Sequence, residues 1–311
     1  MKTKEITFRA SQMGKIMTGT IGLTERQNDM LITYQERKKN ATSGKAKPLT
    51  TIMEETLRSL IDLQKNPELP KTNQTEVRKI WRAKKYKRDF AFTNAYVQKG
   101  ILQEEEGITL FQQYLSSIGI NTLFEKNEKR FRDDFFEGTP DVFDKKNEKL
   151  GYDIKCSWSL DSFAFEQDAL DKHYEYQNQT YMHLTGRKEW WTVYVLVNAT
   201  EHQLNNEKLK WYYAYNAPSE DDIFFDDMEN CQKACEKYMV YDYDRFVELF
   251  PFHNMIIPKD EWHGEGYDIP LADRVVIKKS TYNPEVIQAM KDRIKIARNY
   301  IADLENEHIN N

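Results

Sequence analysis

Residues 137–156 read EGTPDVFDKKNEKLGYDIKC, and this stretch decides how the chain is interpreted. Two runs rich in aromatic and β-branched residues, 135–143 and 150–157, flank the polar turn 145–148. Such runs on either side of a short polar turn predict a β-hairpin.

The second strand of this hairpin has one apolar face and one charged face. Because side chains alternate along a strand, Ile154 and Cys156 share a face that belongs in a core. Asp153 and Lys155 share the opposite face, where half-buried charges are costly unless they are paired or bind a metal. Across the hairpin, Asp141 can approach Asp153.

Two carboxylates on neighbouring strands form a site of hard oxygen ligands that suits Mg²⁺, with Mn²⁺ as the alternative. Such a metal polarises a phosphate and lowers the pKa of a bound water. Lys155 would orient that water or stabilise the charge that develops on the phosphate. A further ligand is expected from Glu104, Glu105 or Glu106. The alternative interpretation is a surface hairpin with an Asp–Lys ion pair.

The rest of the chain predicts an α+β protein with a mixed central sheet flanked by helices. Residues 1–20 predict a short strand and a helix that starts near Ser11, and 37–48 is expected to be a mobile loop. The strand at 191–197 is apolar on both faces, which is typical of a central strand. Helices are predicted at about 51–69, 75–88, 94–118, 161–185, 221–248 and 284–304. Three short strands are predicted within 122–158, and further strands at 190–198 and 209–216. Residues 250–271 are predicted to be irregular.

Composition favours a soluble globular protein of a reducing compartment. The 311 residues are 40% hydrophobic and 31% charged, with no apolar run of membrane-spanning length and no signal-peptide pattern. The three cysteines, Cys156, Cys231 and Cys235, provide no disulfide framework. We therefore expect a cytoplasmic protein, located in the host cytoplasm if a phage encodes it, with no membrane partner.

Charge is distributed unevenly along a chain whose net charge is −5. Acidic residues dominate 220–229, whereas seven basic residues lie between Arg78 and Arg88. The basic stretch is either a solvated helix face or a local surface for DNA phosphates. The second interpretation assigns DNA binding to Arg78, Lys79, Arg82, Lys84 and Lys85.

Other cofactor patterns do not occur in the sequence. With only three cysteines, one of them in the core strand, an iron–sulfur cluster is not expected. The six histidines lack metal-ligand spacing. No Gly-x-x-x-x-Gly-Lys-Ser/Thr loop is present, so no nucleotide cofactor is expected.

These residues resemble the PD-(D/E)XK nucleases, because eleven residues separate Pro140-Asp141 from Asp153-Ile154-Lys155. Four further features are similar to one branch, the lambda-exonuclease or YqaJ-like phage recombination nucleases. They are the segment 10–17, Gly100 followed by Glu104, the segment 137–141, and the segment 174–186 with Gln177. Their order and spacing agree with that branch over about residues 8–200.

The resemblance implies a role for each residue of the site. Glu104, Asp141, Asp153 and the Ile154 carbonyl would hold the metal, and Lys155 would be the catalytic lysine. Gln177 would position the water or Lys155, unless it is a solvated helix residue. Ser11, with Arg9 or Lys4, would hold the phosphate at a DNA 5′ end, although Ser11 also fits a helix N-cap.

The resemblance also implies a restriction-endonuclease-like core within one nuclease domain. We expect this core at about 1–20 and 90–217, a helical and basic insertion at about 25–90, and a C-terminal addition at about 218–311. The chain departs from the family at Asp153, where many members carry Glu. The last helix has a heptad-like apolar seam from Ile287 to Leu304, which would pack on the chain's own core or form a subunit contact.

The expected activity is that of a Mg²⁺-dependent exonuclease that degrades one strand of linear duplex DNA from its 5′ end. By resemblance it would act as a ring-shaped trimer and leave a 3′ overhang for a single-strand annealing protein. Two other functions stay open. One is a structure-specific or restriction-like endonuclease, and the other is a catalytically silent DNA- or partner-binding module.

Overall fold

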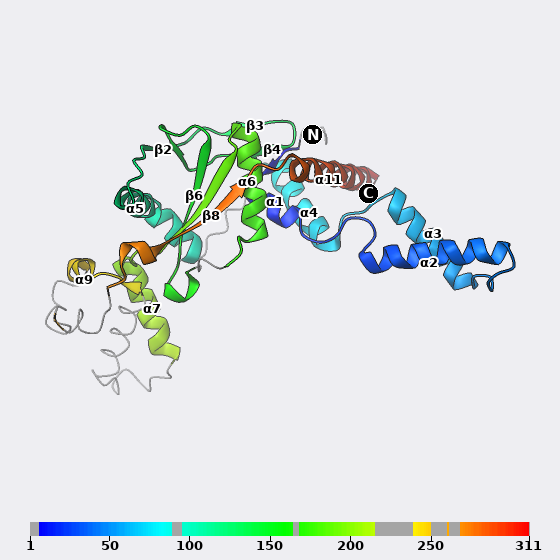
Figure 1. Cartoon of the computed structure of the whole chain (residues 1–311), viewed down its shortest axis with the longest axis horizontal. Coiled ribbons are helices and arrows are strands. Elements are labelled where there is room, and N and C mark those ends of the chain that lie inside the picture. Colours follow the sequence, from blue (N-terminus) through cyan, green and yellow to red (C-terminus); the bar gives the residue numbers. More distant parts are fainter. Residues whose placement is uncertain are drawn as a thin grey trace.

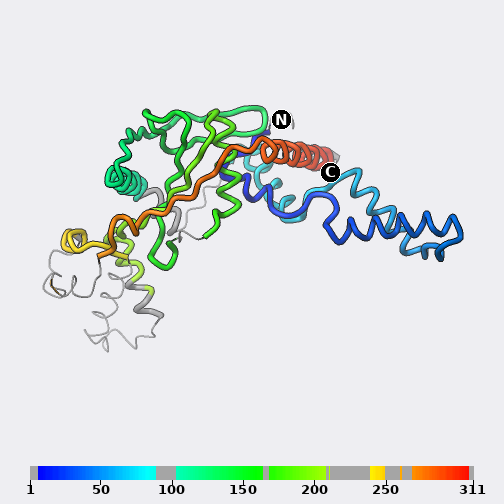
Figure 2. Tube along the Cα trace, viewed as in Figure 1, coloured from blue at the N-terminus to red at the C-terminus, as the bar shows by residue number. Residues whose placement is uncertain are grey.

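The computed structural model describes residues 6–88, 95–163, 168–214, 239–249, 260 and 268–310. Its centre is a five-stranded sheet between helices, and two helices extend from this body as an arm (Figures 1 and 2). A three-stranded sheet is also present. This arrangement confirms the prediction of an α+β protein with a mixed sheet.

The five-stranded sheet has the order β2-β5-β6-β7-β8. Its strands are β2 (Phe124–Lys126), β5 (Val142–Asp144), β6 (Leu150–Cys156), β7 (Glu189–Val195) and β8 (Val275–Thr281). β5 and β6 form the predicted antiparallel hairpin. β6 and β7 are parallel, and α6 (Lys172–Thr185) is the crossover helix between them. β7 pairs on both sides, which confirms the prediction of a central strand.

Each face of this sheet packs on a different helix. α5 (Ala95–Ser117) covers the face that carries Ile154 and Cys156. Gly107 allows this close approach, because a Cβ there would lie 2.8 Å from the sulfur of Cys156. α6 covers the opposite face, where buried Asn178 donates a 2.8 Å hydrogen bond to Thr192 of β7. The predicted alternation along β6 is therefore confirmed.

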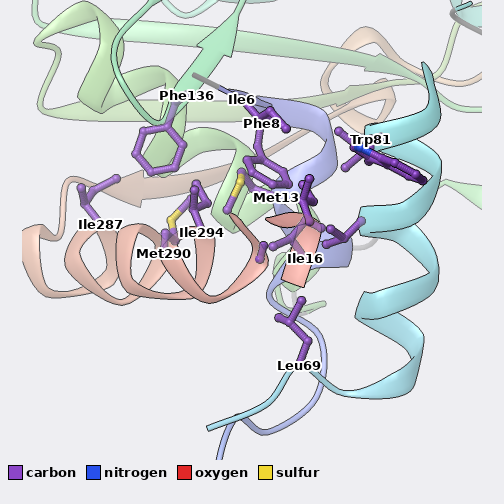
Figure 3. Close-up of a cluster of buried hydrophobic side chains, with 14 residues drawn as sticks. Ile6, Phe8, Met13, Ile16, Leu69, Trp81, Phe136, Ile287, Met290 and Ile294 are labelled. Carbon is purple, nitrogen blue, oxygen red and sulfur yellow. The ribbon is translucent and has the colours of Figure 1, made fainter. Parts of the chain in front are cut away.

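A second core joins the two ends of the chain (Figure 3). β4 (Phe136–Gly138) pairs with both β1 (Phe8–Arg9) and β3 (Phe131–Arg132). Phe8, Phe136 and Trp81 pack there among α1 (Ala10–Ile16), α4 (Lys71–Lys85) and α11 (Pro284–Asn310). The seam of α11 is buried in this cluster, so it packs on the chain's own core. Its residues Ile287, Met290, Ile294, Ala297 and Ile301 are each 3% exposed or less.

The arm has a small core of its own. Its helices are α2 (Glu25–Thr42) and α3 (Thr51–Lys65). Leu31, Leu57 and Leu60 are buried between them. Near the base of the arm, the buried guanidinium of Arg293 in α11 donates hydrogen bonds of 2.7–2.9 Å to three carbonyls of the segment 16–19. This buried cation fixes the segment that leads into the arm to the second core.

The remaining described elements are α7 (Glu201–Ala214), α9 (Tyr243–Leu249) and the 3-10 helices η2 (Leu160–Ser162) and η5 (Leu271–Arg274). None of the helices in the ranges given above is long and apolar enough to cross a membrane. The acidic run 220–229, Cys231 and Cys235 lie outside the described residues.

Three predicted elements differ from the structure. The expected strand at 209–216 is wrong, because its described part continues helix α7. The expected loop at 37–48 is helical as far as Thr42, since α2 needs only a narrow apolar stripe to pack on α3. The run 135–143 divides at Thr139-Pro140, so β4 and β5 belong to different sheets and 122–158 contains five strands instead of three.

α1 begins at Ala10, which agrees with the predicted start near Ser11, but its N-cap is Arg9 and not Ser11. The backbone N–H of Arg9 donates to Gln12 at 3.0 Å. α6 begins at Lys172, later than predicted, because the Asp171 side chain accepts a hydrogen bond from His173 N and caps the helix. The edge strand β8 was not predicted.

We expect Gly151→Ala to destabilise the protein by about 1–3 kcal/mol, because a Cβ on Gly151 would lie 2.2 Å from the ring of Trp190 on the paired strand. Urea unfolding measures the loss. In a Trp190→Leu background the same glycine substitution should cost much less, since the clashing ring is gone. An equal cost in both backgrounds would contradict this account.

We expect part of the stability to be lost in acid through Asp133. Burial acts to raise the pKa of Asp133, but hydrogen bonds from His183, Phe136 N and Phe135 N outweigh it and lower the pKa to about 2. The carboxylate therefore stabilises the fold above pH about 4, and this contribution disappears as the pH falls toward 2. Thermal unfolding of Asp133→Asn should show a smaller loss than the wild type over that range. Asp134→Asn, an exposed neighbour, is the control.

Candidate active site

The hairpin register places two carboxylates opposite each other. Val142 pairs with Tyr152, so Asp141, one residue earlier, faces Asp153, one residue later. The turn that delivers Asp141 is held by Asn127, whose side-chain amide donates to the Pro140 carbonyl at 2.7 Å and whose backbone N–H donates to the Asp141 carbonyl at 2.8 Å. The acid pair predicted from the sequence is therefore present.

The surroundings of Asp141 disfavour its ionised form. Burial raises the pKa of Asp141, and the negative charges of Asp153 and Glu104 raise it further. Lys155 and Lys126 act in the opposite direction, and the net result is a pKa of about 6. A further positive charge near this carboxylate would favour its ionised form.

Asp153 is the most buried member of the site, with 1% of its surface exposed. Its Oδ1 lies 3.0 Å from the Nζ of Lys155. Its Oδ2 is buried and accepts no hydrogen bond from the described residues. An unsatisfied buried carboxylate oxygen is costly, so Oδ2 is a ligand atom that a cation would complete.

Lys155 is a cation in this environment. Burial acts to lower the pKa of its ammonium, but the charge and hydrogen bond of Asp153, followed by Tyr174 and Asp141, outweigh burial and raise the pKa. The ammonium also lies 5.1 Å from the centre of the Tyr174 ring. A lysine that keeps its proton can orient or stabilise an anion and is unsuited to accept a proton.

Gln177 approaches the acid pair through Tyr181. Both residues lie on α6 one turn apart, and the Gln177 amide is 3.5 Å from the Tyr181 hydroxyl. That hydroxyl is 3.5 Å from the carbonyl of Thr139, next to Pro140. Burial raises the pKa of Tyr181, as do Asp153 and Asp141, so its hydroxyl stays protonated. No role was predicted for Tyr181 or Tyr174, although their helical spacing from Gln177 is a signal in the sequence that indicates a shared face.

Glu104 lies near the pair without completing a ligand cluster. Its carboxylate pairs with Lys126 at 3.5 Å. In the ranges that the structure covers, no three His, Cys, Asp or Glu side chains are gathered as a metal site. Ile154 turns its side chain to the apolar face, and the role of its carbonyl stays a prediction. Two facing carboxylates and an unsatisfied Oδ2 nevertheless fit a hard cation that takes one or two protein carboxylates.

A basic cavity of about 340 Å³ lies between α1, α4 and the smaller sheet. Its charged and polar lining consists of Arg9, Gln12, Lys84, Lys87, Arg130 and Glu137. Buried Glu137 organises two of the cations, with Lys84 at 3.2 Å and Arg130 at 2.9 Å. Four cations against one carboxylate leave the cavity positive, so it fits an anion.

The other residues predicted to bind DNA have different surroundings. Arg78 donates to the hydroxyl of Tyr300 in α11, and Lys79 pairs with Glu76 at 2.7 Å. Lys85 lies over the Trp81 ring at 4.7 Å. Ser11 and Arg82 are exposed, and Lys4 lies outside the described residues. The basic stretch of α4 is therefore partly a packing surface and partly a lining of the cavity.

The mixed sheet with its crossover helix, and the Asp141, Asp153 and Lys155 side chains at the β5–β6 hairpin, agree with the fold of known exonucleases. Among solved structures, the chain is similar to a phage-related exonuclease from Haemophilus somnus 129PT, with 19% identity, a TM-score of 0.55, and coverage of 98% of this chain and 97% of that one. It is also similar to the alkaline exonuclease LHK-Exo from Laribacter hongkongensis, with 12% identity, a TM-score of 0.46, and coverage of 98% and 90%. No family model and no curated protein matches the sequence.

We expect Asp141→Asn to stabilise the metal-free protein at neutral pH. The raised pKa means that the folded state resists ionisation of Asp141, so its destabilising effect appears as the pH rises from about 4 and is complete above about 6. The gain should be on the order of 2 kcal/mol at pH 8 and near zero at pH 4. Unfolding in EDTA at both pH values measures it. An equal effect at the two pH values would contradict the raised pKa of Asp141.

Proposed function

We propose that this chain is a divalent-metal-dependent deoxyribonuclease that acts as an exonuclease on linear duplex DNA. The observation that carries the proposal is the Asp141–Asp153 pair beside a lysine that keeps its charge. One buried carboxylate oxygen of this pair accepts no hydrogen bond from any residue that the structure describes. This combination suits stabilisation of a phosphate and a metal at one point. The likeness of the fold to a phage-related exonuclease supports the choice of exonuclease.

Asp141 and Asp153 would hold Mg²⁺ or Mn²⁺. Glu104 would also be a ligand, once its carboxylate has separated from Lys126. A metal bound there would supply Lewis-acid activation of the phosphate and of a water. Lys155 would stabilise the negative charge that develops on the scissile phosphate, since it is already protonated and lies against Asp153. Gln177 and Tyr181 would position the water from the α6 side.

The basic cavity would bind a DNA phosphate outside the acid pair. Arg9 and Lys84, both predicted to bind DNA, line it together with Lys87 and Arg130. Ser11 and Lys4 keep their predicted role at the 5′ phosphate. The 5′-to-3′ direction, the trimeric ring, the annealing partner and the cytoplasmic location come from the resemblance and the composition, and they stay predictions.

We expect purified protein to degrade 5′-phosphorylated linear duplex in Mg²⁺ and to leave closed circular duplex intact. Asp141→Asn and Lys155→Ala should each reduce the rate by about 100-fold or more, because each removes a group that acts on the phosphate or its metal. Lys149→Ala, in the exposed turn of the same hairpin, should keep full activity. Gel analysis of timed reactions, with and without EDTA, measures the effect.

Three results would change the conclusion. Cleavage of the closed circle would move the protein to the endonuclease class. Full activity of Asp141→Asn would exclude the acid pair as the catalytic site. Absence of any cleavage, together with Mg²⁺-independent DNA binding, would favour the silent binding module.

A further inference from the structure

The turn at the far end of the arm carries a concentrated positive charge. Residues 37–53 contain five cations, all between Arg37 and Lys47, and no aspartate or glutamate. The turn lies at the end of α2 and α3 that is most distant from the sheet (Figures 1 and 2). In a chain with a net charge of −5, this segment is a local exception.

The turn has a defined backbone. α2 ends at Thr42, and the residue after its C-cap Ser43 is the left-handed Gly44, with φ +73°. Lys45 N then donates to the Asn40 carbonyl at 2.9 Å. The guanidinium of Arg37 then donates to the carbonyls of Lys47 and Pro48 at 3.1 and 3.3 Å. Arg37 is thus used to brace the turn, and the backbone that presents the lysines is fixed before any ligand binds.

The four lysines of the turn are available for a ligand. Lys38, Lys39, Lys45 and Lys47 are all exposed. Within the described ranges, none of them forms an ion pair, and the nearest acidic residues in sequence are Glu36 and Glu54. An exposed group of unpaired lysines attracts polyanions through their phosphates.

We propose that this basic turn, formed by Lys38, Lys39, Lys45 and Lys47, binds the phosphate backbone of duplex DNA away from the end that is cleaved. The inference rests on the proposed nuclease function and adds a second contact to it. α2 has 18 residues, so it is about 27 Å long. At about 3.4 Å per base pair, this length corresponds to roughly eight base pairs of duplex.

Nucleic acid fits the turn better than a protein partner does. Lysine is depleted from protein–protein interfaces, whose centres need apolar or aromatic residues. The turn between Arg37 and Pro48 carries no aromatic residue and no large aliphatic side chain. Contacts made by lysine alone carry no base information, so the turn would hold duplex DNA of any sequence.

The test compares two variants that lose the same charge. In the arm variant, Lys38, Lys39, Lys45 and Lys47 are replaced with Gln. In the control variant, four exposed lysines at the turn end of the β5–β6 hairpin and before β7 are replaced with Gln, namely Lys145, Lys146, Lys149 and Lys188. Fluorescence anisotropy in EDTA measures binding to a 30-base-pair and an 8-base-pair duplex over a series of salt concentrations, so no cleavage is needed.

The arm variant should bind the long duplex at least about tenfold more weakly than the wild type near 100 mM salt. The slope of log affinity against log salt should become shallower by roughly three to four, one unit for each lost phosphate contact. Binding of the short duplex should change little, and the control variant should behave as the wild type. Equal melting temperatures show that the variants are folded.

An unchanged affinity and slope for the arm variant would overturn the inference while leaving the nuclease proposal intact. An equal loss for both duplex lengths would also overturn it, because the lysines would then act at the cleaved end. Failure of the wild type both to bind and to cleave DNA would instead overturn the proposed function.

Discussion

The rest of the structure depends on one constraint, the charged pair of Asp153 and Lys155 on a buried face of the central strand β6. β6 must bury Ile154 and Cys156 against α5, and strand geometry then forces Asp153 and Lys155 to the other side. A carboxylate that is 1% exposed is tolerated only if a cation is beside it. The second face therefore needs a polar partner helix, and α6 supplies one with buried Gln177, Asn178 and Gln179.

The same constraint fixes the neighbouring elements. Asp141 reaches Asp153 only in the register that pairs Val142 with Tyr152. The ring of Trp190 packs against Gly151 and holds β7 in register with β6. The result is a pair of facing carboxylates, and burial together with their mutual repulsion raises the pKa of Asp141. A fold that keeps such repulsion at its centre gives up stability at one place, which is typical of a functional site.

The sequence predicted the elements whose pattern is local. The hairpin, the central strand β7 and the alternation along β6 follow from side-chain periodicity. β8 could not be predicted from periodicity, because it pairs with a strand about 80 residues earlier and carries the lysines 278 and 279 in its middle. The aromatic residues of 209–216 suggested a strand, but helix α7 continues into them from Glu201.

The candidate site also contains residues that could be predicted from the sequence and residues that only the folded chain brings together. Asp141, Asp153 and Lys155 come from one hairpin, so their proximity could be predicted from spacing alone. Tyr181 and Asn127 act through contacts with a carbonyl of the segment 139–141, and only the folded chain shows these. The positive charge is likewise dispersed along the sequence, in the cavity of Arg9 and Arg130 and in the turn of the arm. The acidic pair repels a polyanion such as DNA, so the proposed DNA binding rests on cations placed elsewhere, and the fold separates the two kinds of charge.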